Sequence, residues 1–146
     1  MRILQLLLLA SGLVASTPTL QETVGIPVPS SPRISPDGKR VAYVVQEADW
    51  KQNEFRSNIW VAAASSTGEP VQLTFTGKNN TAPEWSPDSS HLAFLSDRDG
   101  GKNQIYVIPL GGGEPVALTH VETGVNEFHW SPDGKIVATA GYDRRI

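Results

Sequence analysis

The sequence predicts an all-β fold, a β-propeller of four-stranded blades, of which about two and a half blades are present. The first observation is a repeat: the Ser-Pro-Asp triplet that begins at Ser35 returns at Ser86 and Ser131, at offsets of 51 and 45 residues. The second is composition, because 13 glycines and 11 prolines argue against a helical bundle, and 39% hydrophobic residues argue against a disordered chain. Repeats of about 45 residues with aromatic residues at fixed places are typical of propeller blades.

Residues 1–16 are expected to form a signal peptide. The cation Arg2 precedes an apolar run from Ile3 to Ala15, which is shorter than the ~20 residues that span a bilayer. The small residues Ala15 and Ser16 offer a cleavage site. We therefore expect an exported protein, periplasmic or extracellular, with no membrane attachment after cleavage.

The repeat divides the remaining chain. Residues 17–34 are expected to be a lead-in segment, residues 35–80 the first blade, residues 81–125 the second, and residues 126–146 a partial third. The Gly-Glu-Pro-Val strings at Gly68 and Gly113 keep the 45-residue offset. The six extra residues of the first unit fall mostly within residues 46–58, where we expect them to lengthen a loop.

Each unit reads as four short strands. The first strand leads into Ser-Pro-Asp, the second follows it, the third contains an Ile-aromatic-Val triplet, and the fourth ends at Leu-Thr. In the Ser-Pro-Asp turn, proline presets φ and aspartate bonds the following backbone. Gly38 and Gly134 then take the left-handed position, where the second unit has Ser89. A non-glycine residue there costs ~1–2 kcal/mol, so we expect a looser or differently wound second hairpin.

The repeat count predicts an incomplete ring. A four-stranded sheet must pack between neighbouring blades, and closed propellers have ~4–8 of them. We therefore expect the chain to be the N-terminal part of a longer protein or a truncated reading frame.

Several function classes are excluded by composition. The chain has no cysteine, which removes disulfides, thiol nucleophiles and cysteine-ligated metals. A net charge of −3 gives no broad positive field, so we expect no nucleic-acid partner. None of the three histidines has metal-ligand spacing, and we expect no metal and no cofactor. No G-x-S-x-G nucleophile motif is present either, so we expect no catalytic residue in this chain.

Two residues are candidates for a binding role. Glu84 and His129 occupy equivalent positions in the second and third units, each directly before a tryptophan. If the strand before each Ser-Pro-Asp turn is the innermost of its blade, both side chains line a central channel that selects substrates. The aspartates of the repeated turns and the recurring aromatic residues are interpreted as turn and packing residues instead.

The blades resemble a known family at specific strings. Pro32 to Val45 (PRISPDGKRVAYVV), Ile59-Trp60-Val61, and the segments Leu92 to Gly100 and Gly124 to Gly134 are similar to the start of the propeller in prolyl oligopeptidase-family serine peptidases. The resemblance is to the acylaminoacyl-peptidase and dipeptidyl-peptidase-like branch, and it covers roughly residues 32–139.

The resemblance implies a C-terminal α/β-hydrolase domain, absent here, with a Ser-Asp-His triad. The propeller would cap that domain and admit short peptides, so this chain alone is expected to be inactive. The same blades are also shared with TolB, a non-catalytic periplasmic propeller that binds a protein partner, and with secreted amidohydrolases that carry a propeller. Both alternatives stay open, although the short distance from signal peptide to first repeat favours the peptidase.

Overall fold

The computed structural model describes residues 17–65 and 68–140, with side chains placed up to residue 136. The expected signal peptide, residues 66–67 directly before the first Gly-Glu-Pro string, and the last six residues lie outside this description. The first element of the described residues is a short helix, α1 (Leu20–Val24), capped by Thr19. Ten strands follow, and the all-β prediction is confirmed.

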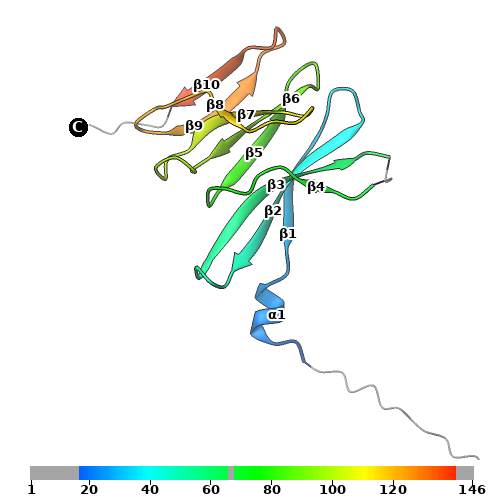
Figure 1. Ribbon diagram of the computed structural model, residues 1–146, viewed down its shortest axis with the longest axis vertical. Helices are drawn as coiled ribbons and strands as arrows, with labels where there is room; N and C mark the ends of the chain where they lie inside the picture. The colour runs from blue at the N-terminus through cyan, green and yellow to red at the C-terminus, as the bar shows by residue number, and fades with distance from the viewer. Residues whose placement is uncertain (1–16, 66–67, 141–146) are drawn as a thin grey trace, which may run out of the picture.

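The strands form two four-stranded antiparallel sheets and one two-stranded hairpin (Figure 1). The first sheet has the order β1-β2-β3-β4, the second β5-β6-β7-β8, and the hairpin pairs β9 with β10. The bounds are β1 (Val28–Ile34), β2 (Arg40–Asp49), β3 (Glu54–Ala63), β4 (Val71–Gln72), β5 (Asn80–Trp85), β6 (His91–Ser96), β7 (Gln104–Pro109), β8 (Val116–Ala117), β9 (Val125–Trp130) and β10 (Ile136–Ala140). Each sheet is one blade, built by consecutive strands.

Apolar side chains between successive blades form the core. One cluster joins the first and second sheets, with Ile59 facing Leu92, Phe94 and Tyr106. A second cluster joins the second sheet to the β9–β10 hairpin through Leu95, Ile105 and Phe128. The second blade is therefore packed on both faces, as the repeat pattern requires.

The first blade begins earlier than the repeat boundary suggests. Strand β1 belongs to the first sheet, although residues 17–34 were expected to be a lead-in segment. It pairs with β2 from Val28 opposite Gln46 to Ile34 opposite Val41. The first unit thus has a first strand equivalent to β5 and β9, and α1 precedes it.

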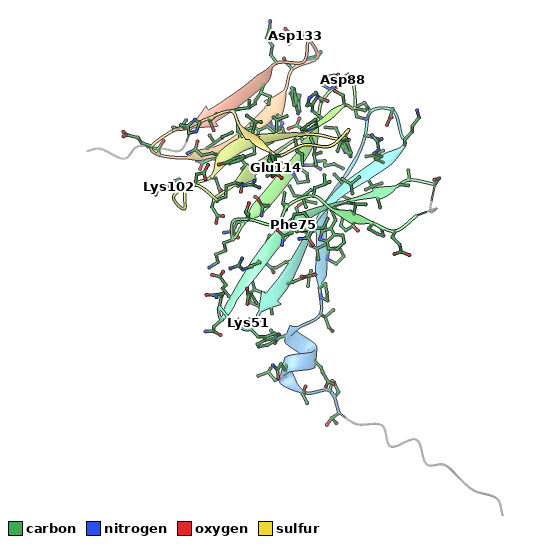
Figure 2. The ribbon with its side chains drawn as sticks, in the orientation of Figure 1. Lys51, Phe75, Asp88, Lys102, Glu114 and Asp133 are labelled. Carbon is green, nitrogen blue, oxygen red and sulfur yellow. The ribbon has the colours of Figure 1, made fainter. Side chains whose placement is uncertain are left out.

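The six extra residues of the first unit extend two strands, so the expectation of a longer loop is wrong. Glu47 pairs with Arg56, and Asp49 with Glu54, continuing the β2–β3 ladder beyond the length of β6–β7. Ion pairs stabilise this extension because Arg56 Nε lies 3.0 Å from Asp49 Oδ2 and Arg56 Nη2 lies 3.2 Å from Glu54 Oε1. The hairpin tip, marked by Lys51, reaches toward α1 (Figure 2).

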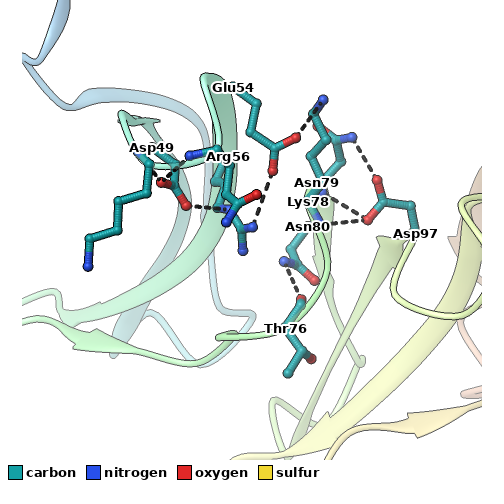
Figure 3. A network of polar contacts seen from close by, with 10 residues as sticks. Asp49, Glu54, Arg56, Thr76, Lys78, Asn79, Asn80 and Asp97 are labelled. Carbon is teal, nitrogen blue, oxygen red and sulfur yellow. Dashed lines mark hydrogen bonds and ion pairs between the residues drawn. The ribbon is translucent and has the colours of Figure 1, made fainter.

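A polar network fastens this long hairpin to the second blade (Figure 3). Glu54 also pairs with Lys78 Nζ at 3.0 Å, in the connection between the sheets. The backbone amides of Lys78 and Asn79 donate to Asp97 Oδ1, at 2.8 and 3.0 Å. Partial burial raises the pKa of Asp97, but these bonds together with one from the Asn79 side-chain amide outweigh it, so the pKa is lowered.

The Ser-Pro-Asp turns have the expected chemistry. The Ser35 hydroxyl and the Lys39 amide donate to Asp37 Oδ1, and Ser86 and Ser90 do the same for Asp88. Hydrogen bonds from the serine hydroxyls hold the pKa of both carboxyls below the usual range. The aspartates are therefore turn residues, as the repeat predicted.

The expectation of a looser second hairpin is wrong. Ser89 does adopt a positive φ of 60°, close to the 72° of Gly38. Its amide donates to the Ser86 carbonyl at 2.8 Å, the same bond that Gly38 makes to Ser35. The Ser89 hydroxyl also accepts the Asp37 amide of the first blade at 3.1 Å, which offsets the backbone strain.

The third hairpin is the one that is wound differently. Trp130 pairs with Ile136, six residues further along the chain. Trp85 pairs with Leu92, seven residues further along, so the connection in the third hairpin is one residue shorter. The Ser131 amide accordingly bonds the Lys135 carbonyl, and the Ser86 amide bonds that of His91.

Candidate channel site

The innermost strands of the three units lie side by side. β1, β5 and β9 each stand first in their sheets, and β5 contacts both β1 and β9. The second residue before the Ser-Pro-Asp turn on these strands is Arg33, Glu84 or His129. These three equivalent residues line one hollow of about 410 Å³ between the strands.

The structure brings the two predicted residues together. His129 Nδ1 lies 3.4 Å from Glu84 Oε2, and His129 Nε2 lies 3.1 Å from Glu127 Oε1. The hydrogen bond to Glu127 and the charge of Glu84 raise the pKa of His129 above its ordinary value. Glu84 Oε1 also accepts the Trp130 amide at 3.2 Å, so this carboxylate joins β5 to β9.

Tryptophan side chains fix the backbone of the lining residues. The Trp85 indole Nε1 donates to the Arg33 carbonyl at 2.8 Å, and the Trp130 indole Nε1 donates to the Glu84 carbonyl at 3.2 Å. Each innermost strand is thus tied to the one before it by the same bond. The tryptophans pack between blades, as expected, and also hold the backbone of Arg33 and Glu84.

A backbone bulge precedes each lining residue on the first two strands. The pairing register shifts between Ser30 and Arg33, and between Thr81 and Glu84. Ser31 and Ala82 have positive φ values of 52° and 49°, a conformation that costs ~1–2 kcal/mol for residues other than glycine. Bulges redirect the side chains that follow them.

Sequence analysis missed both Arg33 and these bulges, although the 51-residue offset relates Arg33 to Glu84 and also Pro32 to Pro83.

A larger hollow, of about 590 Å³, lies away from Glu84. It is bounded by the second and third Ser-Pro-Asp turns, with Val107, Leu118 and Trp130 as its apolar lining. This hollow is the groove between the second blade and the β9–β10 hairpin, and its charged groups, Asp88 and Asp133, are already engaged in turns.

At the second Ser-Pro-Asp turn, a serine, an aspartate and a histidine lie together but not in the order of a catalytic triad. The Ser90 hydroxyl donates to Asp88 Oδ2 at 2.7 Å and lies 2.6 Å from His91 Nδ1. Serine stands between the other two residues, whereas nucleophilic catalysis requires histidine between serine and carboxylate. In the described part of the chain, no three histidine or acidic side chains form a group that fits a metal ion.

The fold and its innermost-strand site define a propeller-type protein. A family model described as TolB beta propeller domain matches residues 19–145. The chain therefore belongs to the TolB β-propeller domain family.

Curated relatives include peptidases. The chain is 39% identical over 119 residues to an uncharacterized peptidase, YuxL, of Bacillus subtilis, covering 82% of this chain and 18% of that protein. It is 35% identical over 104 residues to dipeptidyl-peptidase 5 of Porphyromonas gingivalis, covering 71% and 15%. The chain thus spans less than a fifth of the length of these relatives.

Solved structures agree in fold. Acylaminoacyl peptidase of Pyrococcus horikoshii superposes with a TM-score of 0.66 at 19% identity, covering 85% of this chain and 19% of that one. The propeller domain of the Trilobed protease from Pyrococcus furiosus gives a TM-score of 0.64 at 22% identity, covering 84% of this chain and 36% of that one.

In the residues that the structure describes, no helix is long and apolar enough to span a membrane.

Proposed function

We propose that this chain is the N-terminal propeller portion of an exported serine peptidase of the prolyl oligopeptidase family. Its propeller restricts access to a C-terminal α/β-hydrolase domain, and Glu84 and His129 line the channel that short peptides pass. The substrates are short peptides, and the partners of this chain are the remaining blades and the hydrolase domain.

The match to the YuxL peptidase over 82% of the chain carries this proposal. The match to a dipeptidyl-peptidase supports the same class. The covered share of these relatives, 18% and 15%, supports a larger parent protein.

The geometry supports a lining role for Glu84 and His129. Both side chains border the hollow between innermost strands, and Glu84 is held by an amide and an imidazole of the next blade. A fixed carboxylate at such a place discriminates between substrates by charge, because it cannot turn away from a passing ligand.

The parent reading frame tests the proposal. We expect it to encode G-x-S-x-G followed by aspartate and histidine, and its product to bind a fluorophosphonate covalently and to cleave short peptides faster than casein. A reading frame without that motif, whose product neither binds the probe nor cleaves peptides, contradicts a peptidase. N-terminal sequencing of the exported protein tests removal of residues 1–16, since a retained Met1 contradicts it.

A variant tests the channel role separately. Glu84→Gln in the parent protein is expected to change kcat/KM for cationic relative to neutral peptides about 2- to 5-fold. Glu114→Gln is the matched control because Glu114 is an exposed acid in the turn between β7 and β8 of the same blade. An equal response of both variants contradicts a lining role for Glu84.

A TolB-like, partner-binding propeller is the second candidate. The chain is 40% identical over 70 residues to the Tol-Pal system protein TolB of Alcanivorax borkumensis, covering 48% of this chain. A parent chain that ends after its last blade, and that captures an envelope protein without cleaving peptides, would support this alternative.

A further inference from the structure

Arg33 differs from the other charged groups of its hollow. It lies on β1 at the position equivalent to Glu84 and His129 and is exposed toward solvent. Within the described residues, its guanidinium makes neither an ion pair nor a side-chain hydrogen bond. Its backbone, in contrast, is fixed, because the Arg33 carbonyl accepts the Trp85 indole at 2.8 Å.

The acids of the hollow are already occupied. Glu84 is engaged by the Trp130 amide and by His129 Nδ1, and Glu127 lies 3.1 Å from His129 Nε2. A neighbouring carboxylate would normally neutralise an arginine at this place. Here His129 contacts both Glu84 and Glu127, and within the described residues neither acid pairs with the Arg33 guanidinium.

We propose that Arg33 is a specificity-determining residue that binds a carboxylate group of the peptide substrate in this hollow. This inference rests on the proposed function and deepens it. A guanidinium stays protonated at every physiological pH and presents paired N–H donors that match the two oxygens of a carboxylate. The bulge at Ser31 and Pro32 directs Arg33, and the Trp85 bond prevents its backbone from shifting.

Two sources supply a carboxylate in a short peptide. One is the C-terminal main-chain group, and the other is an aspartate or glutamate side chain. Three matched peptides separate them: a free acid, its C-terminal amide, and the amide with aspartate as the last residue.

The experiment compares the full parent protein with Arg33→Gln, using kcat/KM for these peptides. We expect the wild type to prefer one of the carboxylate-bearing peptides over the plain amide by about 3- to 10-fold, in keeping with a charge-assisted hydrogen bond near solvent. Arg33→Gln should reduce that ratio to about 1 while cleavage of the plain amide stays close to wild type.

Arg40→Gln is the matched control. Arg40 is an exposed arginine on the neighbouring strand β2, and it does not line the hollow. The Trp85 bond uses the backbone of Arg33, so both variants should unfold at the wild-type temperature. A wild type without carboxylate preference, or an Arg33→Gln variant that keeps it, overturns the inference. A wild type that cleaves no peptide overturns the proposed function instead.

Discussion

The first and second blades share a sequence pattern but have different surroundings. Phe94 in the second blade is fully buried, whereas Tyr43 at the equivalent position of the first is half-buried. Trp85 is 6% exposed and its counterpart Ile34 is 69% exposed. The difference lies in the neighbours, because the described residues cover the second blade on both faces and the first on one. A blade therefore depends for its stability on the blade beside it.

Truncating the aromatic residue on each blade tests this difference most strongly. Phe94 stacks on Tyr106, with ring centroids 5.9 Å apart, and the Arg98 guanidinium lies 5.4 Å from its ring. Phe94→Ala should reduce the free energy of unfolding by about 3–5 kcal/mol. Tyr43→Ala should cost about half as much, because less of its side chain leaves water. Urea denaturation measures both, and equal losses would mean that the first blade is covered in solution.

Asn80 tests the polar junction between the same two blades. Its amide donates to the Thr76 carbonyl at 3.0 Å (Figure 3). The same amide donates to the Ser57 carbonyl at 3.2 Å, and the Asn80 side-chain carbonyl accepts Ser96 Oγ at 2.8 Å. Asn80→Val, which installs the residue found at the equivalent position 125, should cost about 2–3 kcal/mol because buried polar groups lose their partners.

Asn79→Ala is the control for that change. Asn79 is half-buried, and its amide nitrogen donates to Asp97 Oδ2 at 2.8 Å. Its loss should cost about 1 kcal/mol, less than that of Asn80. A smaller effect at Asn80 than at Asn79 would show that the buried junction does not hold the blades together.

The repeat was enough to predict the blade architecture and the turns, and it placed Glu84 and His129 at equivalent positions of neighbouring units. Fixed offsets place equivalent residues on equivalent strands, and adjacent blades then bring those strands together. The length of the β2–β3 hairpin was not predictable in this way. Its extra residues have no counterpart in the second unit, and the structure pairs them as strands, with ion pairs joining Arg56 to Asp49 and Glu54.

The Ser89 error has a different origin. The cost of the left-handed backbone at Ser89 was predicted from local sterics alone. That prediction did not include the hydrogen bond from the amide of Asp37, which lies 52 residues away in the chain. The same applies to Arg33, whose free charge follows from how His129 engages the two acids near it. Local sequence rules predicted the geometry of the turns, whereas contacts between blades determined the surroundings of Ser89 and Arg33.

Exchanging the residues at the left-handed turn position tests that explanation. Gly38→Ser should cost about 1 kcal/mol because it adds strain at a φ of 72°. Ser89→Gly should change the free energy of unfolding by less than about 1 kcal/mol, since relieved strain is offset by loss of the bond from the Asp37 amide. Thermal or urea unfolding of both variants gives the answer, and a clear gain in stability for Ser89→Gly would show that the inter-blade bond contributes little.

The smallest effect concerns the charge of His129, which the first blade cannot reproduce because Arg33 occupies its position. The pKa of His129 is raised, first by the hydrogen bond to Glu127 and then by the charge of Glu84. A folded-state pKa above the unfolded value means that protonation favours the fold. This contribution is complete below the ordinary pKa of 6.5 and is lost as pH rises through the folded value. NMR titration of the His129 ring should show the raised pKa, with a larger decrease in Glu127→Gln than in Glu84→Gln. The reverse order would mean that Glu84 on β5, rather than Glu127 on β9, is the principal partner and sets the charge of the histidine.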